Sequence, residues 1–254
     1  MKHIILLIAF TFFNVSFAQK SIKVSYEQNI FYSDAFFSQL PEQDREDFRV
    51  VLSKPNKFEL INNGNFSLFK SLDVKEEVIA SKEANNATSM NKGTVIKPFK
   101  VWILKDFLKQ SNISSTEVEG VEYYAEKLFS IEELKYDKRV KVIDGYTCMS
   151  AYSRSAANDT IQYWYTQEIP VIDGPFLMST IPGLVLSIES KKKVVYVTKI
   201  EFFDKKIEID SFNKKVSFIS EAELIKMKQE VLKPKSYTEE DGGKHSTNSV
   251  QIKN

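Results

Sequence analysis

The feature that constrains this chain most is a cluster of backbone-restricting residues between two apolar segments. Three of the seven prolines and two of the eight glycines lie in it: Pro170, Gly174, Pro175, Pro182 and Gly183. Proline fixes φ, whereas glycine permits conformations that other residues avoid, so this segment must follow one particular path. The aromatic residues 163–165 before it and the apolar residues 184–188 after it predict two strands joined by a stiff crossing.

Residues 1–18 have the pattern of a secretory signal peptide. A short basic start is followed by an apolar run over residues 4–13 and by small residues at Ser16 and Ala18. The apolar run is shorter than the roughly 20 residues that a spanning helix needs, and no cysteine follows the small residues. We therefore expect an exported, soluble protein, periplasmic or secreted, with no lipid anchor and no integral membrane segment in the mature chain.

The remaining chain predicts one β-rich domain over residues 19–233 and a disordered polar tail over 234–254. Alternating apolar and polar residues recur throughout the domain and are typical of strands. We predict an α+β, β-rich fold: a curved antiparallel sheet or partly open barrel with an N-terminal helical segment and a C-terminal helix. The C-terminal helix should begin at the capping box that runs from Ser220 to Glu223.

Four shorter segments have predictions of their own. Residues 62–64 (Asn-Asn-Gly) lie between two alternating runs and predict a hairpin turn. The polar residues 110–120 predict a loop, as do residues 81–93. Residues 206–209 predict a short strand near the end of the sheet.

Composition excludes several kinds of chemistry. The formal net charge is +1, with basic and acidic residues interleaved, so the sequence offers no basic surface for nucleic acid. After removal of residues 1–18, one histidine (His245) and one cysteine (Cys148) remain, which is too few for a typical zinc site or a histidine-based triad. We predict no catalytic residues, no metal site and no cofactor, and we expect Cys148 to be a small buried core residue.

The residues that we expect to shape the key surface surround the crossing: Trp164, Tyr165, Pro170, Gly174, Pro175, Pro182 and Gly183. Consecutive strand residues point to opposite faces, so at least one of the aromatic residues must belong to the core, and we expect this of Trp164. Glu168 and Asp173 have two interpretations, as a general acid and base or as solvated turn residues; we favour the solvated turn.

Four blocks of this region resemble the signature of the GLPGLI family, exported envelope proteins of Gram-negative bacteria. The blocks are Gly145–Ala151, Trp164–Pro170, Gly174–Pro175 and Ile181–Leu186. The family's six-residue string falls on residues 180–185, where Thr180, Ile181 and Val185 depart from it. The resemblance implies export and a β-rich envelope role, and it implies no enzyme activity.

Three functions fit these observations. The first is a non-enzymatic binding protein with an apolar groove for a lipid-like or hydrophobic ligand. The second is a protein-interaction module, accessory to an outer-membrane transport or secretion system and in contact with another envelope protein. The third is a hydrolase that uses two carboxylates, which would have to converge in a cleft.

Overall fold

The chain is organised around one large open sheet, as the sequence predicts. The computed structural model describes residues 21–72, 76–80, 93–96, 99–130, 133–176, 180–209 and 218–231. The main sheet contains β1 (Ser21–Ile30), β2 (Asn56–Asn62), β3 (Phe66–Leu72), β6 (Trp102–Asp106), β7 (Ser111–Val118), β8 (Val121–Leu128), β9 (Lys135–Ile143), β10 (Tyr146–Arg154), β11 (Thr160–Thr166), β12 (Leu184–Glu189) and β13 (Lys193–Phe203). The other elements are the hairpin of β4 (Glu77–Ala80) and β5 (Gly93–Ile96), the helices α1 (Asp34–Ser38), α2 (Arg45–Leu52) and α3 (Glu221–Val231), and a 3₁₀ turn at Glu42–Asp44. The predicted signal peptide, the tail after residue 233 and most of the loop predicted over 81–93 lie outside the described residues.

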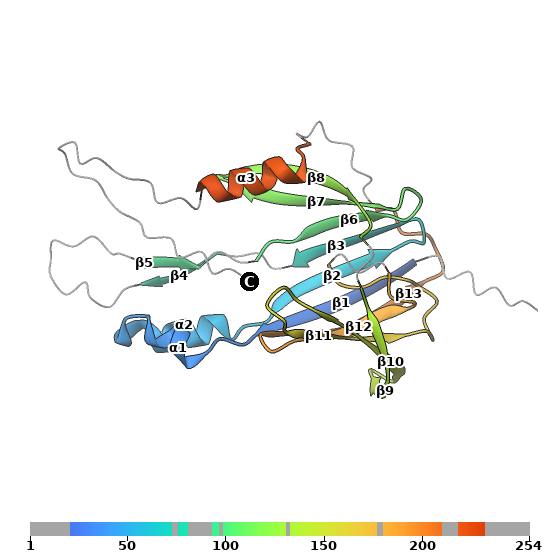
Figure 1. Cartoon of the computed structure of the whole chain (residues 1–254), viewed down its shortest axis with the longest axis horizontal. Helices are drawn as coiled ribbons and strands as arrows, with labels where there is room; N and C mark the ends of the chain where they lie inside the picture. The colour runs from blue at the N-terminus through green and yellow to red at the C-terminus, as the bar shows by residue number, and fades with distance from the viewer. Residues whose placement is uncertain are drawn as a thin grey trace, which may run out of the picture.

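The 11 strands of the main sheet have the order β8-β7-β6-β3-β2-β1-β13-β12-β11-β10-β9. Every pairing in this sheet is antiparallel, and two runs of neighbouring strands meet where β1 pairs with β13. Register shifts interrupt the β1–β13, β9–β10 and β11–β12 ladders, and such bulges increase the local twist of a sheet. The sheet therefore curves strongly, and β9 and β10 run across the direction of β1 to β3 (Figure 1). Because β8 and β9 remain as edges, the fold is a curved open sheet.

The two faces of the sheet differ in chemistry. The core face carries Tyr26, Phe58 and Phe69, which are fully buried, and the chain crossing before β12 packs over it. Phe176 of that crossing contacts both Phe58 and Phe69, with ring centroids 5.7 and 5.0 Å apart. The polar face is the opposite one, and alternation places Glu27 and Glu59 on it. The core thus lies between the sheet and the crossing.

The helices lie at two places around the sheet (Figure 1): α1 and α2 beyond the ends of β1 and β2, and α3 beside the edge strand β8. Phe48 of α2 joins Phe37 and Ile79 in a small separate apolar cluster. Leu224 of α3 packs against Val118 and Ala125 of β7 and β8. The predicted capping box is confirmed, because the Glu223 amide donates to Ser220 Oγ and the Ser220 amide donates to Glu223 Oε2.

Two local predictions were wrong. Residues 111–118 form β7 and not a loop, because their main chain pairs with β6 and β8 on both sides although their side chains are mostly polar. Residues 206–209 form no strand. They are instead held by side chains, since the Ile207 amide donates to Ser21 Oγ at 2.7 Å and its carbonyl accepts from Asn63 Nδ2 at 3.0 Å.

Candidate functional site

A cavity of about 470 Å³ opens where β9 begins, β10 ends and β11 begins. Its described lining residues combine two tyrosines with charged and hydroxyl side chains: Glu133, Lys135, Tyr152, Ser153, Arg154, Ser155, Ile161 and Tyr163. The volume falls within the range that accommodates small ligands in proteins. Aromatic surface beside hydrogen-bonding groups suits a ligand that is itself amphipathic and polar.

The turn between β10 and β11 fixes this end of the cavity. The Ser155 amide donates to the Asp159 carbonyl, and the Asp159 amide donates to Ser155 Oγ. Asn158 has φ +60°, a conformation that asparagine tolerates better than most residues, and its Oδ1 accepts from Arg154 at 2.9 Å. Arg154 is exposed, and this hydrogen bond holds its guanidinium group beside the cavity that the residue lines.

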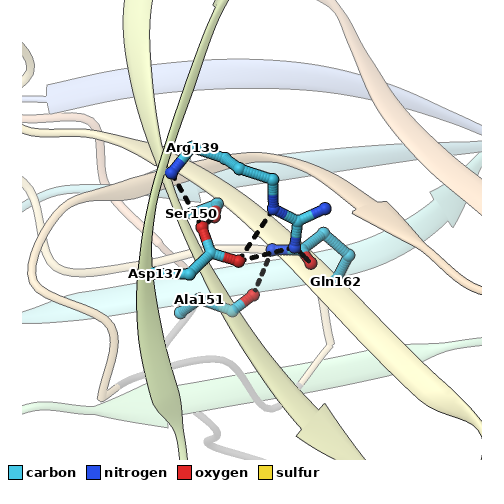
Figure 2. A network of polar contacts seen from close by, with 5 residues as sticks. All are labelled: Asp137, Arg139, Ser150, Ala151 and Gln162. Atoms are coloured by element: carbon cyan, nitrogen blue, oxygen red, sulfur yellow. Dashed lines mark hydrogen bonds and ion pairs between the residues drawn. The ribbon is translucent and has the colours of Figure 1, made fainter.

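A polar network lies next to the cavity on the polar face (Figure 2). Arg139 donates from Nε and Nη2 to Asp137 Oδ2, and Ser150 Oγ donates to the same carboxylate. Arg139 also donates to the side-chain oxygen of Gln162, whose amide nitrogen donates to the Ala151 carbonyl. Hydrogen bonds from Arg139 and Ser150 lower the pKa of Asp137 to about 2, so this carboxylate is charged at any physiological pH.

Trp164 lies beneath two cationic side chains of β9. Lys141 Nζ is 4.3 Å and the Arg139 guanidinium carbon 5.7 Å from the centroid of its ring, and the residue is 7% exposed. Lys141 also pairs with Glu189 of β12 at 2.5 Å. Burial by itself raises the pKa of Glu189, but Lys141, through its hydrogen bond and charge, and hydrogen bonds from Trp164 and Ser187 together outweigh burial, so the net pKa is lowered. The expectation that Trp164 is buried is confirmed.

The second polar cluster is fully buried beneath the crossing on the core face. Lys105 Nζ of β6 contacts Asp173 Oδ1 and the Gly174 carbonyl, each at 2.7 Å. Asn62 Nδ2 donates to the other oxygen of Asp173 at 2.8 Å. Burial lowers the pKa of Lys105, although the neighbouring Asp173 opposes that shift. The favoured interpretation of Asp173 as a solvated turn residue is wrong, because it is 1% exposed and ion-paired.

The structure distributes the sequence-predicted residues over both faces of the sheet. Trp164 lies on the polar face, whereas Tyr165 points to the core face, where its ring meets that of Tyr136 edge-on at 6.2 Å. Of the predicted residues in the crossing, three are buried (Gly174, Pro175 and Gly183), Pro182 is half-buried and Pro170 is exposed. These residues determine the path of the main chain and do not gather into one surface.

Gly183 explains part of the backbone restriction. Its φ is +152°, and a Cβ atom at this position would overlap the carbonyl oxygen of Thr166 at the end of β11. The glycine therefore permits the crossing to pass directly against the neighbouring strand.

Sequence reasoning singled out Tyr163, as part of the aromatic residues 163–165, but missed the other residues that line the cavity. Glu133, Lys135 and Arg154 are spaced like the other charged residues of a half-exposed strand. Lys105 was missed as well, because a lysine at the end of the apolar run 101–104 gives no sign in the sequence of a buried carboxylate partner. What sets these side chains apart from ordinary surface residues is their neighbours, which come from distant segments of the chain.

Cys148 is fully buried, and burial raises the pKa of its thiol to about 11. The residue therefore belongs to the core, as predicted. Among the described residues, no group of histidine, cysteine, aspartate and glutamate side chains is arranged to hold a metal ion. In the same part of the chain, no helix has the length and apolar character needed to cross a membrane.

The fold and the cavity define a class: an open antiparallel β-sheet protein with a small polar-aromatic pocket near one sheet edge. Residues 59–224, more than half of the chain, match the family model described as "N-glycanase peptide, N-terminal domain". The chain belongs to this family.

Solved structures of PNGF-II have a similar fold. One, in space group P21, is 17% identical with a TM-score of 0.54 and is matched over 84% of this chain and 34% of its own. Another, in space group C2, is 16% identical with a TM-score of 0.56, over 83% of this chain and 33% of its own. The chain thus spans about a third of the length of these proteins. No curated protein sequence matches it.

Proposed function

We propose that this chain is a non-enzymatic binding domain whose cavity at the β9–β10–β11 corner holds part of a glycan chain. The observation that carries the proposal is the lining of that cavity. Tyr152 and Tyr163 supply aromatic surface, and Ser153 and Arg154 supply hydrogen-bonding groups. Sugars present apolar ring faces between hydroxyl groups, so they require both kinds of contact. The family description names an N-glycanase, which supports an N-linked glycan as the ligand class.

Binding without catalysis fits the state of the reactive groups. The buried carboxylate of Asp173 is paired with Lys105, and the Cys148 thiol is buried with a raised pKa. Of the described residues that line the cavity, Glu133 supplies the carboxylate, whereas glycoside hydrolysis generally uses two. The hydrophobic ligand, the envelope-protein partner, the GLPGLI assignment and export to the periplasm or medium stay predictions.

Calorimetric titration with a free N-linked glycan, and separately with palmitate, tests the proposal. We expect the glycan to bind the wild-type chain, and Tyr152→Ala and Arg154→Ala each to weaken binding at least tenfold, about 1.4 kcal/mol. Lys109→Ala is the control, because Lys109 is 72% exposed and pairs only loosely with Asp106, at 3.9 Å. Binding of palmitate but not glycan would instead support the hydrophobic carrier. Release of glycan from a glycoprotein would show catalysis.

A further inference from the structure

The edge strand β9 combines main-chain groups that face away from β10 with exposed apolar side chains. It pairs with β10 on one side and is the last strand of the sheet on the other. Tyr136, Val140 and Val142 are 53%, 59% and 68% exposed. An exposed apolar row on an open sheet edge is unfavourable for an isolated protein and is typical of a place where another strand is added.

The register shows which main-chain groups are free. Asp144 and Gly145 have φ values of +50° and +82°, the signature of a tight two-residue hairpin turn between β9 and β10. Ile143 is registered opposite Tyr146, and the pair that flanks such a two-residue turn is a hydrogen-bonded pair. The N–H and C=O groups of alternate residues of the edge strand then point outward. Val142 and Val140 therefore direct their N–H and C=O groups away from β10. No hydrogen bond from another described segment reaches these groups.

The apolar side chains share one face. Val140 is registered opposite Met149, which is registered opposite Tyr165. Tyr136 also contacts the Tyr165 ring, so the row lies on the same side as the core face. An added strand that presents apolar side chains to this row would extend the core face by one strand.

The charge of β9 restricts which strand fits. The strand carries four basic residues (Lys135, Lys138, Arg139 and Lys141) and one acidic residue (Asp137). Arg139 is paired with Asp137 and Lys141 with Glu189, whereas the exposed Lys135 and Lys138 have no carboxylate partner among the described residues. Two copies of this basic edge would repel each other, and the β9–β10 bulge further opposes self-pairing.

From these observations we propose that β9 is a docking edge for an extended acidic segment of a partner protein, which adds to the sheet as a further strand. Its apolar side chains cover Tyr136, Val140 and Val142, and its carboxylates meet Lys135 and Lys138. The main-chain groups of Val140 and Val142 supply the hydrogen bonds, as in other cases of strand addition. This surface is separate from the proposed function of the cavity, although Lys135 borders both.

The probe is a short synthetic peptide that alternates valine and glutamate, with a valine–lysine peptide as its matched control. We expect the acidic peptide to bind, binding to weaken with salt, and the amides of Val140 and Val142 to exchange more slowly with solvent in the complex. Lys138→Glu should weaken binding at least tenfold, and Lys109→Glu should leave it unchanged.

A second pair of measurements tests strand addition itself. Val142→Pro removes an outward N–H group that β10 does not use, so it should abolish binding while the edge strand tolerates it. Should that variant fail to fold, methylation of alternate peptide amides tests the same hydrogen bonds on the wild-type protein, and it should abolish binding equally. Binding that survives methylation, unchanged exchange of the Val140 and Val142 amides, or self-association through β9 would each overturn the proposal.

Discussion

Lys105 Nζ and Asp173 Oδ1 lie 2.7 Å apart, and both side chains are completely shielded from solvent. They are 68 residues apart in the sequence and fasten the crossing to β6. Removing one member of such a pair leaves the other charge buried and uncompensated, which is far more costly than losing an exposed ion pair.

Lys105→Met should therefore destabilise the protein by about 3–5 kcal/mol in urea unfolding. The double variant Lys105→Met/Asp173→Asn should lose less than Lys105→Met alone, because the amide keeps an acceptor for Asn62 and buries no charge. Lys54→Met is the control, since its ion pair with Glu77 is exposed and should contribute at most about 1 kcal/mol. Equal losses in Lys105→Met and Lys54→Met would contradict the role given to the buried pair.

Gly183→Ala should cost more stability than Gly120→Ala. Both glycines have positive φ, so an alanine at either position carries a conformational penalty of about 1–2 kcal/mol. Only at Gly183 would the new Cβ also meet main-chain atoms of Thr166, whereas nothing lies within 4 Å at Gly120. Both variants are unfolded in urea, and their midpoint concentrations are compared on the condition that the slope m of the unfolding free energy is the same in both. Similar midpoints would contradict the close approach of the crossing to β11 at Gly183.

Arg139→Gln should raise the pKa of Asp137 from about 2 toward the ordinary carboxyl value of roughly 4. The pKa is depressed in the folded protein, so the carboxylate's contribution is present at neutral pH and is lost as the pH falls through about 2. Titration of the side-chain carboxyl carbon by NMR gives the pKa directly. Arg49→Gln, which removes the partner of the exposed Asp34, should leave the Asp137 titration unchanged.

Cys148 should not react with a disulfide reagent at pH 8 while the protein is folded. The side chain is shielded from solvent, and with a thiol pKa of about 11 little thiolate forms at that pH. In denaturant the single cysteine should react completely. Rapid reaction of the native protein would show that β10 opens readily.

Local patterns predicted the elements whose signals are contained in a few residues. The turn at residues 62–64, the aromatic strand before Pro170 and the capping box at Ser220 depend on short spacings, and the structure has them where expected. β7 was missed because its Ser- and Asn-rich sequence lacks an apolar alternation, and the strand forms through main-chain pairing with both neighbours.

The polar clusters depend on contacts between distant segments, which one sequence does not reveal. From the sequence alone, Asp173 has the pattern of a solvated turn residue. Only the structure shows that Lys105 and Asn62 bind its carboxylate. The cavity has the same origin, since its lining comes from the start of β9 and from the turn between β10 and β11. The proline and glycine cluster correctly indicated a constrained crossing but not which side chains the crossing would bury.

The pairing of β1 with β13 has a consequence for how the chain folds. The register joins Ser21 to Phe203, so the first and last strands of the main sheet in chain order meet in the middle of that sheet. The strands on each side of this seam are mostly joined to their sequence neighbours and can form early, whereas the seam must wait until nearly the whole domain has been synthesised. A chain still being synthesised would thus present two half-sheets with open inner edges, and it would be most prone to misassociation before that one ladder closes.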